Sequence, residues 1–282
     1  MISSPYIGET KQGVSIPLSI SIREVLELLA DSDGGSPENG VDRLEYGDPD
    51  TAVKGIATAF IASQHVIERA KSLEVNLLIT HEGLFYNHFQ PGEQIARTDV
   101  VREKKSMIEQ SGVAIYRNHD GVHRSQPDGI TYGLVRELDW LDELDGYRSF
   151  AAMIRLPGLT VAEIAAHVKN KLGLGQVRVV GDRTMSCERI GVLVGYRGGG
   201  NPVIPLFERE NLDLILYGEG PEWETPEYVK DSISQNKPRA LVILGHAASE
   251  APGMKYLAES LQTKLPDIPV HFISEAPLFE IL

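Results

Sequence analysis

The stretch Val75-Asn-Leu-Leu-Ile-Thr-His-Glu-Gly83 decides the fold, because a short apolar run passes directly into an imidazole, a carboxylate and a glycine. An apolar run of this length is typical of a buried strand. The stretch Leu212-Asp-Leu-Ile-Leu-Tyr-Gly-Glu-Gly220 has the same build, and in each copy a strand-like and a helix-like segment come first. This weak internal repeat predicts two α/β lobes of similar design.

Strand-like and helix-like segments alternate along the rest of the chain, which predicts the α/β class, with two linked lobes and mostly parallel mixed sheets. We expect strands at 55–62, 75–80, 113–116, 189–195, 212–216, 240–244 and 270–273. We expect helices at 22–29, 64–72 and 101–110, one capped by Thr160 and ending at Gly173, one starting with Asn201 and Pro202, and a last helix before residue 270. The expected division is a first lobe of residues 1–128 plus 245–282, carrying most metal ligands, and a second lobe of residues 129–244.

The composition excludes several classes of protein. The formal net charge of −13 disfavours binding to nucleic acid or to an anionic membrane surface. Cys187 is the only cysteine, so neither an intrachain disulfide nor a cysteine-rich zinc site can form, and we expect this thiol to be buried. Residues 1–12 lack the basic start and apolar run of a signal peptide, and no apolar run is long enough to span a bilayer. These features predict a soluble, cytoplasmic protein.

Metal-competent side chains collect where three predicted strands end. They are His81 with Glu82, His119 with Asp120 and His123, and His246 with Glu250. Ligands of parallel α/β sheets bind beyond the carboxyl ends of the strands, so we expect these side chains to converge. Imidazole and carboxylate donors suit Zn, Mn, Fe or Co. Adjacent residues of an extended segment point to opposite sides, so His81 and Glu82 could serve two different ions.

Each cluster also has a simpler explanation, because a single histidine after a strand is more often a loop residue or a capping donor. Three clusters at equivalent strand ends would require three coincidences, so we predict one metal site.

Other residues have less specific interpretations. His88 follows the first cluster and could contact its ligands without binding the ion, whereas His167 is expected on a solvated helix face. Gly198-Gly-Gly200 could present N–H groups to an anion, although a tight turn explains it more simply. The acidic run 136–143 is expected to form a solvated helix face.

These segments resemble the Nif-three-like dinuclear-metal proteins, whose members are named GTP cyclohydrolase type-two homologues. The resemblance spans most of the chain. It rests on Tyr46-Gly-Asp-Pro-Asp50, Asn76-Leu-Leu-Ile-Thr-His-Glu82, Ile115-Tyr-Arg-Asn-His119 and, most specifically, Gly245-His-Ala-Ala-Ser-Glu250. It implies two linked α/β lobes, a ring-shaped homo-hexamer and two metal ions held by histidine and carboxylate ligands.

The resemblance also bears on individual ligands. His81, His246 and Glu250 match ligands of the family directly. Glu82 stands where the family has a second histidine, and His123 stands where it usually has a bridging aspartate. We expect both to be ligands as well, and the bridge between the ions could pass to Glu82, Glu250 or Asp120.

Bound divalent ions can polarise a carbonyl or phosphoryl group and activate water near neutral pH. We therefore predict a metal-dependent hydrolase acting on a small-molecule substrate, with His119, Asp120 or His88 as acid or base. A nucleotide is one candidate substrate, and cyclohydrolase activity is implied by the resemblance alone. The same residues would also suit a non-catalytic metal chaperone, buffer or regulatory scaffold, or ions that hold an oligomer together.

Overall fold

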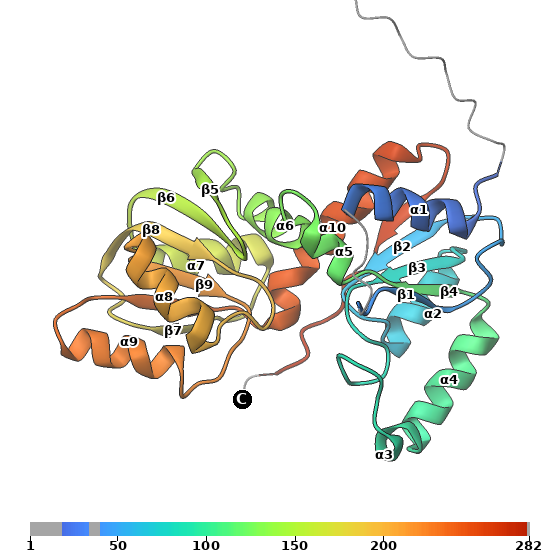
Figure 1. Cartoon of the computed structure of the whole chain (residues 1–282), viewed down its shortest axis with the longest axis horizontal. Coiled ribbons are helices and arrows are strands. Elements are labelled where there is room, and N and C mark those ends of the chain that lie inside the picture. The colour runs from blue at the N-terminus through green and yellow to red at the C-terminus, as the bar shows by residue number, and fades with distance from the viewer. Residues whose placement is uncertain (1–18, 34–39, 281–282) are drawn as a thin grey trace, which may run out of the picture.

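The computed structural model describes residues 19–33 and 40–280 of the 282-residue chain. Two sheets lie at the centres of two lobes, which are arranged end to end (Figure 1). The predicted α/β class with two sheets is confirmed. Residues 1–12, where we expect no signal peptide, lie outside the described ranges.

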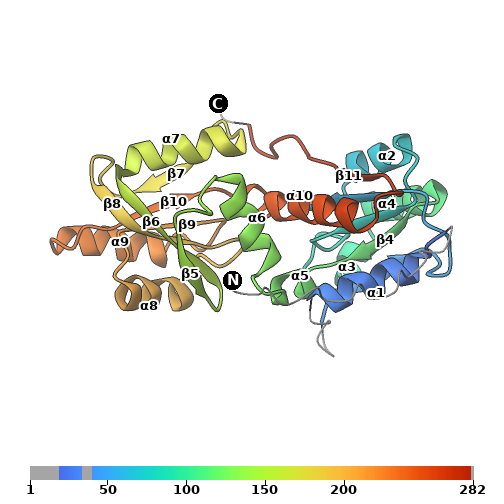
Figure 2. The same ribbon diagram turned by 90° about the horizontal axis from the view of Figure 1, so that it is seen from above.

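The first sheet has the order β1-β4-β3-β2-β11, and all its pairs are parallel except β1 against β4. Its strands are β1 (Arg43–Tyr46), β2 (Ile56–Ala59), β3 (Leu77–Thr80), β4 (Ala114–Arg117) and β11 (Val270–Phe272). Every residue of β2 and β3 is buried, because helices cover both faces of the sheet. Those helices are α2 (Gln64–Ser72) and α4 (Asp99–Ser111) on one face and α1 (Ile22–Asp33) on the other (Figure 2). Two short helices, α3 (Glu93–Ala96) and α5 (Asp120–Arg124), complete this part of the chain.

The second sheet has the order β5-β6-β8-β9-β10-β7. Its central strands β8, β9 and β10 are parallel, whereas the outer pairs are antiparallel. The strands are β5 (Leu144–Arg148), β6 (Ala151–Thr160), β7 (Arg178–Val180), β8 (Ser186–Val192), β9 (Leu214–Tyr217) and β10 (Ala240–Ile243). Helix α7 (Val161–Leu172) covers one face, and α8 (Gly200–Glu210) and α9 (Thr225–Ser234) cover the other (Figure 2).

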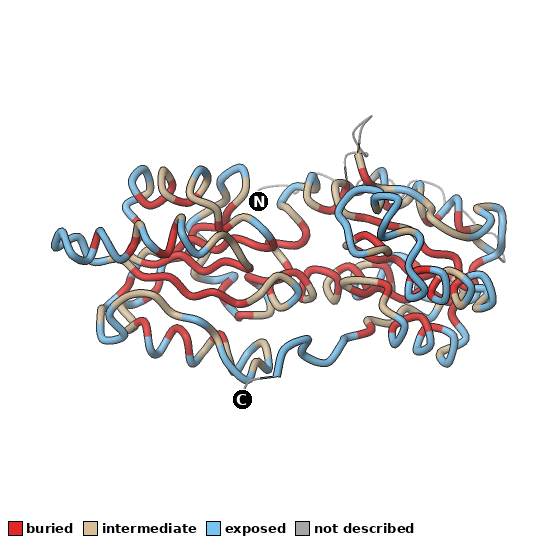
Figure 3. Tube along the Cα trace, turned by 90° about the horizontal axis from the view of Figure 1, so that it is seen from below, coloured by how far each residue is buried: buried red, intermediate tan, exposed pale blue. Residues whose placement is uncertain are grey.

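Two helices join the sheets. Helix α10 (His246–Lys264) starts after β10 of the second sheet and leads to β11 of the first, and α6 (Gly129–Glu137) packs along it. The two helices meet at glycines, since a Cβ added to Gly133 would lie 2.5 Å from the Cα of Gly253. Figure 3 shows buried residues in both sheets and in the helices between them. The position of α10 therefore depends on a direct backbone contact with α6.

The predicted strands and helices occur with shifted ends, but some details of the prediction were wrong. Helix α8 starts at Gly200 rather than after an Asn201 cap, because the Gly200 N–H donates to the Glu224 carboxylate at 2.6 Å. The run 136–143 is not a helix face: α6 ends at Glu137, and Trp140 is buried. His167 is half-buried rather than fully solvated, since its ring stacks on Trp140 and its Nε2 lies 2.7 Å from a backbone carbonyl.

Two further predictions concern the burial of Cys187 and the absence of a membrane-spanning segment. Cys187 is buried, as predicted, and burial raises the pKa of its thiol to about 12. Within the described ranges, no helix is both long and apolar enough to cross a membrane. The cytoplasmic location stays a prediction.

The glycine contact between α6 and α10 can be tested by Gly133→Ala. The added methyl group would overlap the backbone at Gly253, so we expect the free energy of unfolding to fall by about 1–3 kcal/mol, a typical cost of overpacking. Gly175→Ala is the matched control, because a Cβ there meets nothing within 4 Å. Urea unfolding of the two variants measures the difference, and equal stabilities would contradict the proposed contact.

Candidate metal centre

Three chain segments that lie far apart in sequence meet between the two sheets. His81 and Glu82 follow β3, and His119 follows β4, with His123 one turn later on α5. His246 and Glu250 occupy the first turns of α10, so their four-residue spacing places them on one helix face. The carboxyl ends of β3 and β4 lie side by side because these strands are parallel neighbours.

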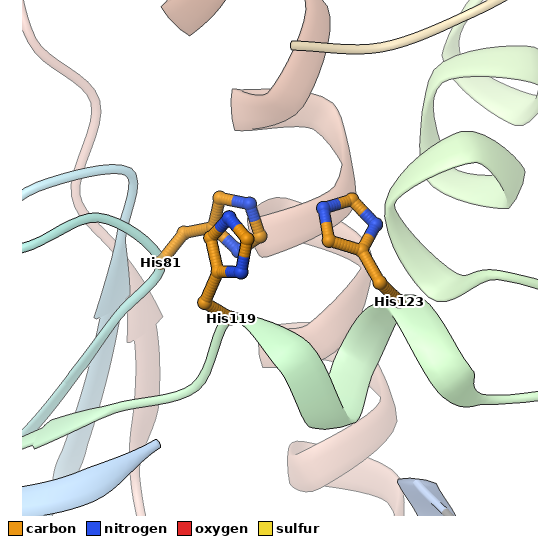
Figure 4. Close-up of side chains that lie close together, drawn as sticks. All are labelled: His81, His119 and His123. Atoms are coloured by element: carbon orange, nitrogen blue, oxygen red, sulfur yellow. The ribbon is translucent and has the colours of Figure 1, made fainter. Parts of the chain in front are cut away.

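The five predicted ligands, together with His119, fall into two adjacent neighbourhoods. The candidate ligand atoms of His81, His119 and His123 all lie within 4.8 Å of one another, and Figure 4 shows the three rings close together. The same limit holds for Glu82, His246 and Glu250. The two neighbourhoods touch at Glu250, whose Oε2 lies 3.2 Å from His81 Nε2 and 3.0 Å from His246 Nε2.

All four of these imidazoles share one arrangement: Nδ1 lies beside an oxygen acceptor. The acceptors are the Asn118 carbonyl for His81 at 3.2 Å, Asp120 for His119 at 2.8 Å, Asp128 for His123 at 3.0 Å and Glu219 for His246 at 2.9 Å. An acceptor at Nδ1 favours the proton there, which leaves a lone pair at Nε2. Histidines that bind metal are usually held in this way. At His123 the Arg197 guanidinium, which can only donate, also lies 3.0 Å from Nδ1, so Asp128 and Arg197 compete for this nitrogen.

Buried polar atoms without a hydrogen-bond partner mark the centre of the site. They include His81 Nε2 and Glu250 Oε2, on side chains that are 0% and 3% exposed. Leaving such atoms unsatisfied costs free energy, so a cation is the group that fits between a carboxylate and imidazole lone pairs. The His and Glu cluster could therefore hold a metal ion.

The charges of the site agree with this interpretation. Burial would raise the pKa of Glu250, but His81 and His246 hold it well below its usual range. Burial likewise opposes protonation of His246, yet the Glu250 and Glu219 carboxylates raise its pKa to about 9. Burial and the neighbouring His81 lower the pKa of His119 to about 3, so His119 is neutral. Without an ion, protons on His81 and His246 balance the carboxylates, and a metal ion would compete with those protons.

Glu82 is held by a buried cation. The Arg117 guanidinium lies 3.2 Å from Glu82 Oε2 and 3.1 Å from His88 Nδ1, and the Arg117 side chain is 2% exposed. Glu82 Oε1 is thereby directed toward His246 Nε2, 3.5 Å away. Glu82, His88 and His119 also lie within 4.8 Å of one another, but an ion there would face the Arg117 charge. His88 thus supports Glu82 through Arg117, in line with the supporting role suggested for it.

Asp120 lies behind the site rather than in it. Its Oδ1 accepts from His119, and its Oδ2 accepts from the Val41 backbone N–H at 2.9 Å. Asp42 anchors the same segment by accepting from the backbone N–H groups of His119 and Asp120 at 2.7 and 2.8 Å. Asp120 therefore orients His119, and the catalytic role predicted for this pair stays a prediction.

Residues of the second sheet's loops complete the surroundings. Arg197 lies 2.9 Å from the Asp128 carboxylate and 3.0 Å from His123 Nδ1. Gly195 has φ +57°, and a Cβ there would collide with the Glu250 carboxylate, so only glycine fits. The glycines 198–200 do not form the expected tight turn, since Gly199 is the N-cap of α8 and Gly200 its first residue, and the Gly200 N–H that could meet an anion donates to Glu224.

Several supporting residues were missed by the sequence prediction, and two of them had a usable signal. Glu219 occupies the same place in the internal repeat as Glu82, and the two carboxylates approach opposite nitrogens of His246. Asp128 precedes a helix, where an aspartate is a common cap, and it does accept from the N–H groups of Ile130 and Thr131. The roles of Arg117 and Arg197 depend on distant contacts that no local pattern indicates.

The fold and the site together define a class: a two-sheet α/β protein with a buried His and Glu cluster suited to metal. The family model of Duf34/NIF3 (NGG1p interacting factor 3) matches residues 37–277, and the chain belongs to this family. The resemblance suggested by the sequence is thereby confirmed.

Relatives and solved structures agree with this membership. The chain is 24% identical over 243 residues to a "GTP cyclohydrolase 1 type 2 homolog" of Chlamydia pneumoniae, covering 85% of this chain and 91% of the relative. It is 22% identical over 265 residues to a protein of the same name in Clostridium perfringens, covering 90% and 95%. A Bacillus cereus protein related to NIF3 has the same fold, with a TM-score of 0.73 at 14% identity over 94% of this chain and 99% of that one.

The acceptor at His123 Nδ1 can be tested by Asp128→Asn. The amide keeps an oxygen for the helix cap but replaces Oδ2 by a donor, so His123 loses the acceptor that favours its proton on Nδ1. We expect the affinity for Zn²⁺ to fall about 10–100-fold, the usual cost of losing such a partner. Competition with a chromophoric chelator measures this, and Asp182→Asn, on an exposed turn, is the control. Unchanged zinc affinity in Asp128→Asn would remove Asp128 from the site.

Proposed function

We propose that this chain is a metal-dependent hydrolase of small molecules that works with two divalent transition-metal ions. The observation that carries the proposal is the pair of buried, unpartnered atoms, His81 Nε2 and Glu250 Oε2, in the middle of six candidate ligands. Zn, Mn, Fe and Co are the ions that suit a mixed imidazole and carboxylate donor set.

The ions would supply polarisation of a carbonyl or phosphoryl group and easier ionisation of water. The chain's own residues would position the reactants. Asp120 holds the proton of His119 on Nδ1, so Nε2 of this neutral ring is free either to bind an ion or to accept a proton as a general base. Arg117 contacts one oxygen of Glu82, and the other oxygen is directed toward the site.

The exposure of the site limits the size of the substrate. The most exposed of the six side chains is His246 at 26%, and His81 is fully buried. Only a small part of a substrate, such as one carbonyl or phosphoryl group, would therefore contact the ions. The names of the curated relatives make nucleotides the first class of compound to test.

The same low exposure favours a second candidate function. A metal chaperone, buffer or regulatory scaffold needs an enclosed site with tightly held ligands and no room for a substrate. The buried Glu250 and the four oriented imidazoles satisfy that need equally well. Turnover is the measurement that separates the two candidates.

Metal-stripped full-length protein, reloaded with Zn²⁺, Mn²⁺, Fe²⁺ or Co²⁺, should hydrolyse at least one member of a panel of nucleotides and phosphoesters. We expect Glu82→Gln and His119→Ala to lower kcat/KM about 100-fold or more, the usual range for a lost base or ligand. His65→Ala, an exposed position on α2, should keep full activity. Tight metal uptake with no turnover on the whole panel would favour the non-catalytic alternative.

We also propose that the protein assembles as a homo-hexamer, as the family resemblance implies. Light scattering of the metal-loaded protein should then give six times the 31.0 kDa mass of one chain. If the ions serve to hold the oligomer together, chelation should dissociate it, whereas a hexamer that persists after chelation would leave the ions free for chemistry. A monomer in both states would contradict the assembly.

A further inference from the structure

We propose that the two ion positions differ in chemical kind, so that one chain holds two different metals side by side. One position has the three imidazoles of His81, His119 and His123, and we name it the imidazole position. The other has Glu82, His246 and Glu250, and we name it the carboxylate position. This inference rests on the proposed metal site, but it does not depend on catalysis.

The imidazole position has three rings as its donors, and the carboxylate oxygen nearest to its Nε2 atoms is Glu250 Oε2, 3.2 Å from His81 Nε2. Its ring centroids lie 4.5, 5.0 and 5.1 Å apart, and each Nδ1 is directed to an oxygen acceptor. The nearest carboxylate oxygen to His123 Nε2 is Glu250 Oε1, 3.9 Å away.

The carboxylate position contains two negative charges and one imidazole. Glu82 Oε1 lies 3.5 Å from His246 Nε2, and Glu250 Oε2 lies 3.0 Å from the same atom. Arg117 Nη2 lies 3.2 Å from Glu82 Oε2, which leaves Glu82 Oε1 directed toward this position. Glu250 Oε2 also lies 3.2 Å from His81 Nε2, so the two positions share this carboxylate, and Glu82 is the carboxylate that distinguishes them.

These donor sets select ions by different properties. Imidazole nitrogens suit Zn and Cu, whereas carboxylate oxygens suit Mn and Mg. Zinc binds more tightly than manganese at almost any mixed site, so a preference for zinc alone decides nothing. The diagnostic quantity is the ratio of zinc to manganese affinity, which should be larger at the imidazole position than at the carboxylate position.

The test uses metal-stripped full-length protein loaded with Zn²⁺ and then titrated with excess Mn²⁺. Released zinc is followed with a chromophoric chelator, bound manganese by electron paramagnetic resonance, and final contents by elemental analysis. We expect two separate steps, in which one zinc per chain leaves at a concentration of Mn²⁺ about tenfold or more below that needed for the second. The intermediate state should contain one ion of each metal.

The variant His123→Asp gives the imidazole position a carboxylate. The Mn²⁺ concentrations at which the two zinc ions leave should therefore become about tenfold closer to each other. Glu82→His makes the opposite change at the carboxylate position, and zinc should there become harder to displace. His65→Asp introduces the same chemical change on the exposed face of α2 and should leave both steps in place. Melting temperatures of the metal-free variants identify any variant that fails to fold. If His123→Asp does not fold, the zinc displacement from the Glu82→His variant tests the inference.

A single step in the wild-type protein, or two steps that neither variant moves, would overturn the inference. Neither outcome touches the proposed hydrolysis, because turnover with one kind of metal at both positions would remain measurable. Conversely, two distinct steps in a protein without turnover would support the inference and count against the enzyme.

Discussion

The site depends on a single kind of interaction: an oxygen atom that lies beside the Nδ1 of each histidine. A neutral imidazole has two tautomers, and only the tautomer protonated at Nδ1 leaves a lone pair on Nε2. The Asn118 carbonyl and the Asp120 and Glu219 carboxylates favour that tautomer in His81, His119 and His246, whereas at His123 the Asp128 carboxylate competes with the Arg197 guanidinium. Without these acceptors, the same histidines would alternate between donor and acceptor and would surround Glu250 less favourably.

The second requirement is that the N-terminus of α10 has a fixed position relative to the first sheet. His246 and Glu250 are fixed to α10, whereas His81 and His119 follow β3 and β4, so an axial shift of the helix would separate Glu250 from His81. The glycine contact between α10 and α6 limits such a shift, because backbone against backbone has few alternative registers. Two parts of the chain that fold around different sheets thereby contribute to one site.

The sequence predicted the ligands better than their supports. Ligands at 81, 119 and 246 follow apolar strands, and the topology of parallel sheets places strand ends together. The supports come from elsewhere: Asp42 from the segment before β1, Asp128 from the cap of α6 and Arg197 from the loop after β8. The strand β5 was also missed, because it is half-exposed and contains Gly146, and β6 was missed although its first four residues are buried, because Pro157 and Gly158 interrupt its second half.

The internal repeat gives a physical reason for the asymmetry of the centre. Both copies end in Glu-Gly, but the first has His81 before its glutamate and the second has Gly218, against which Ser249 packs closely. A side chain at 218 would collide with Ser249 and with the loop at Gly195, so the second copy can offer only Glu219. That glutamate reaches the outer nitrogen of His246 while Glu82 reaches the inner one. The first copy thus supplies His81 and Glu82 as donors, and the second copy holds His246 through Glu219, which concentrates negative charge around His246.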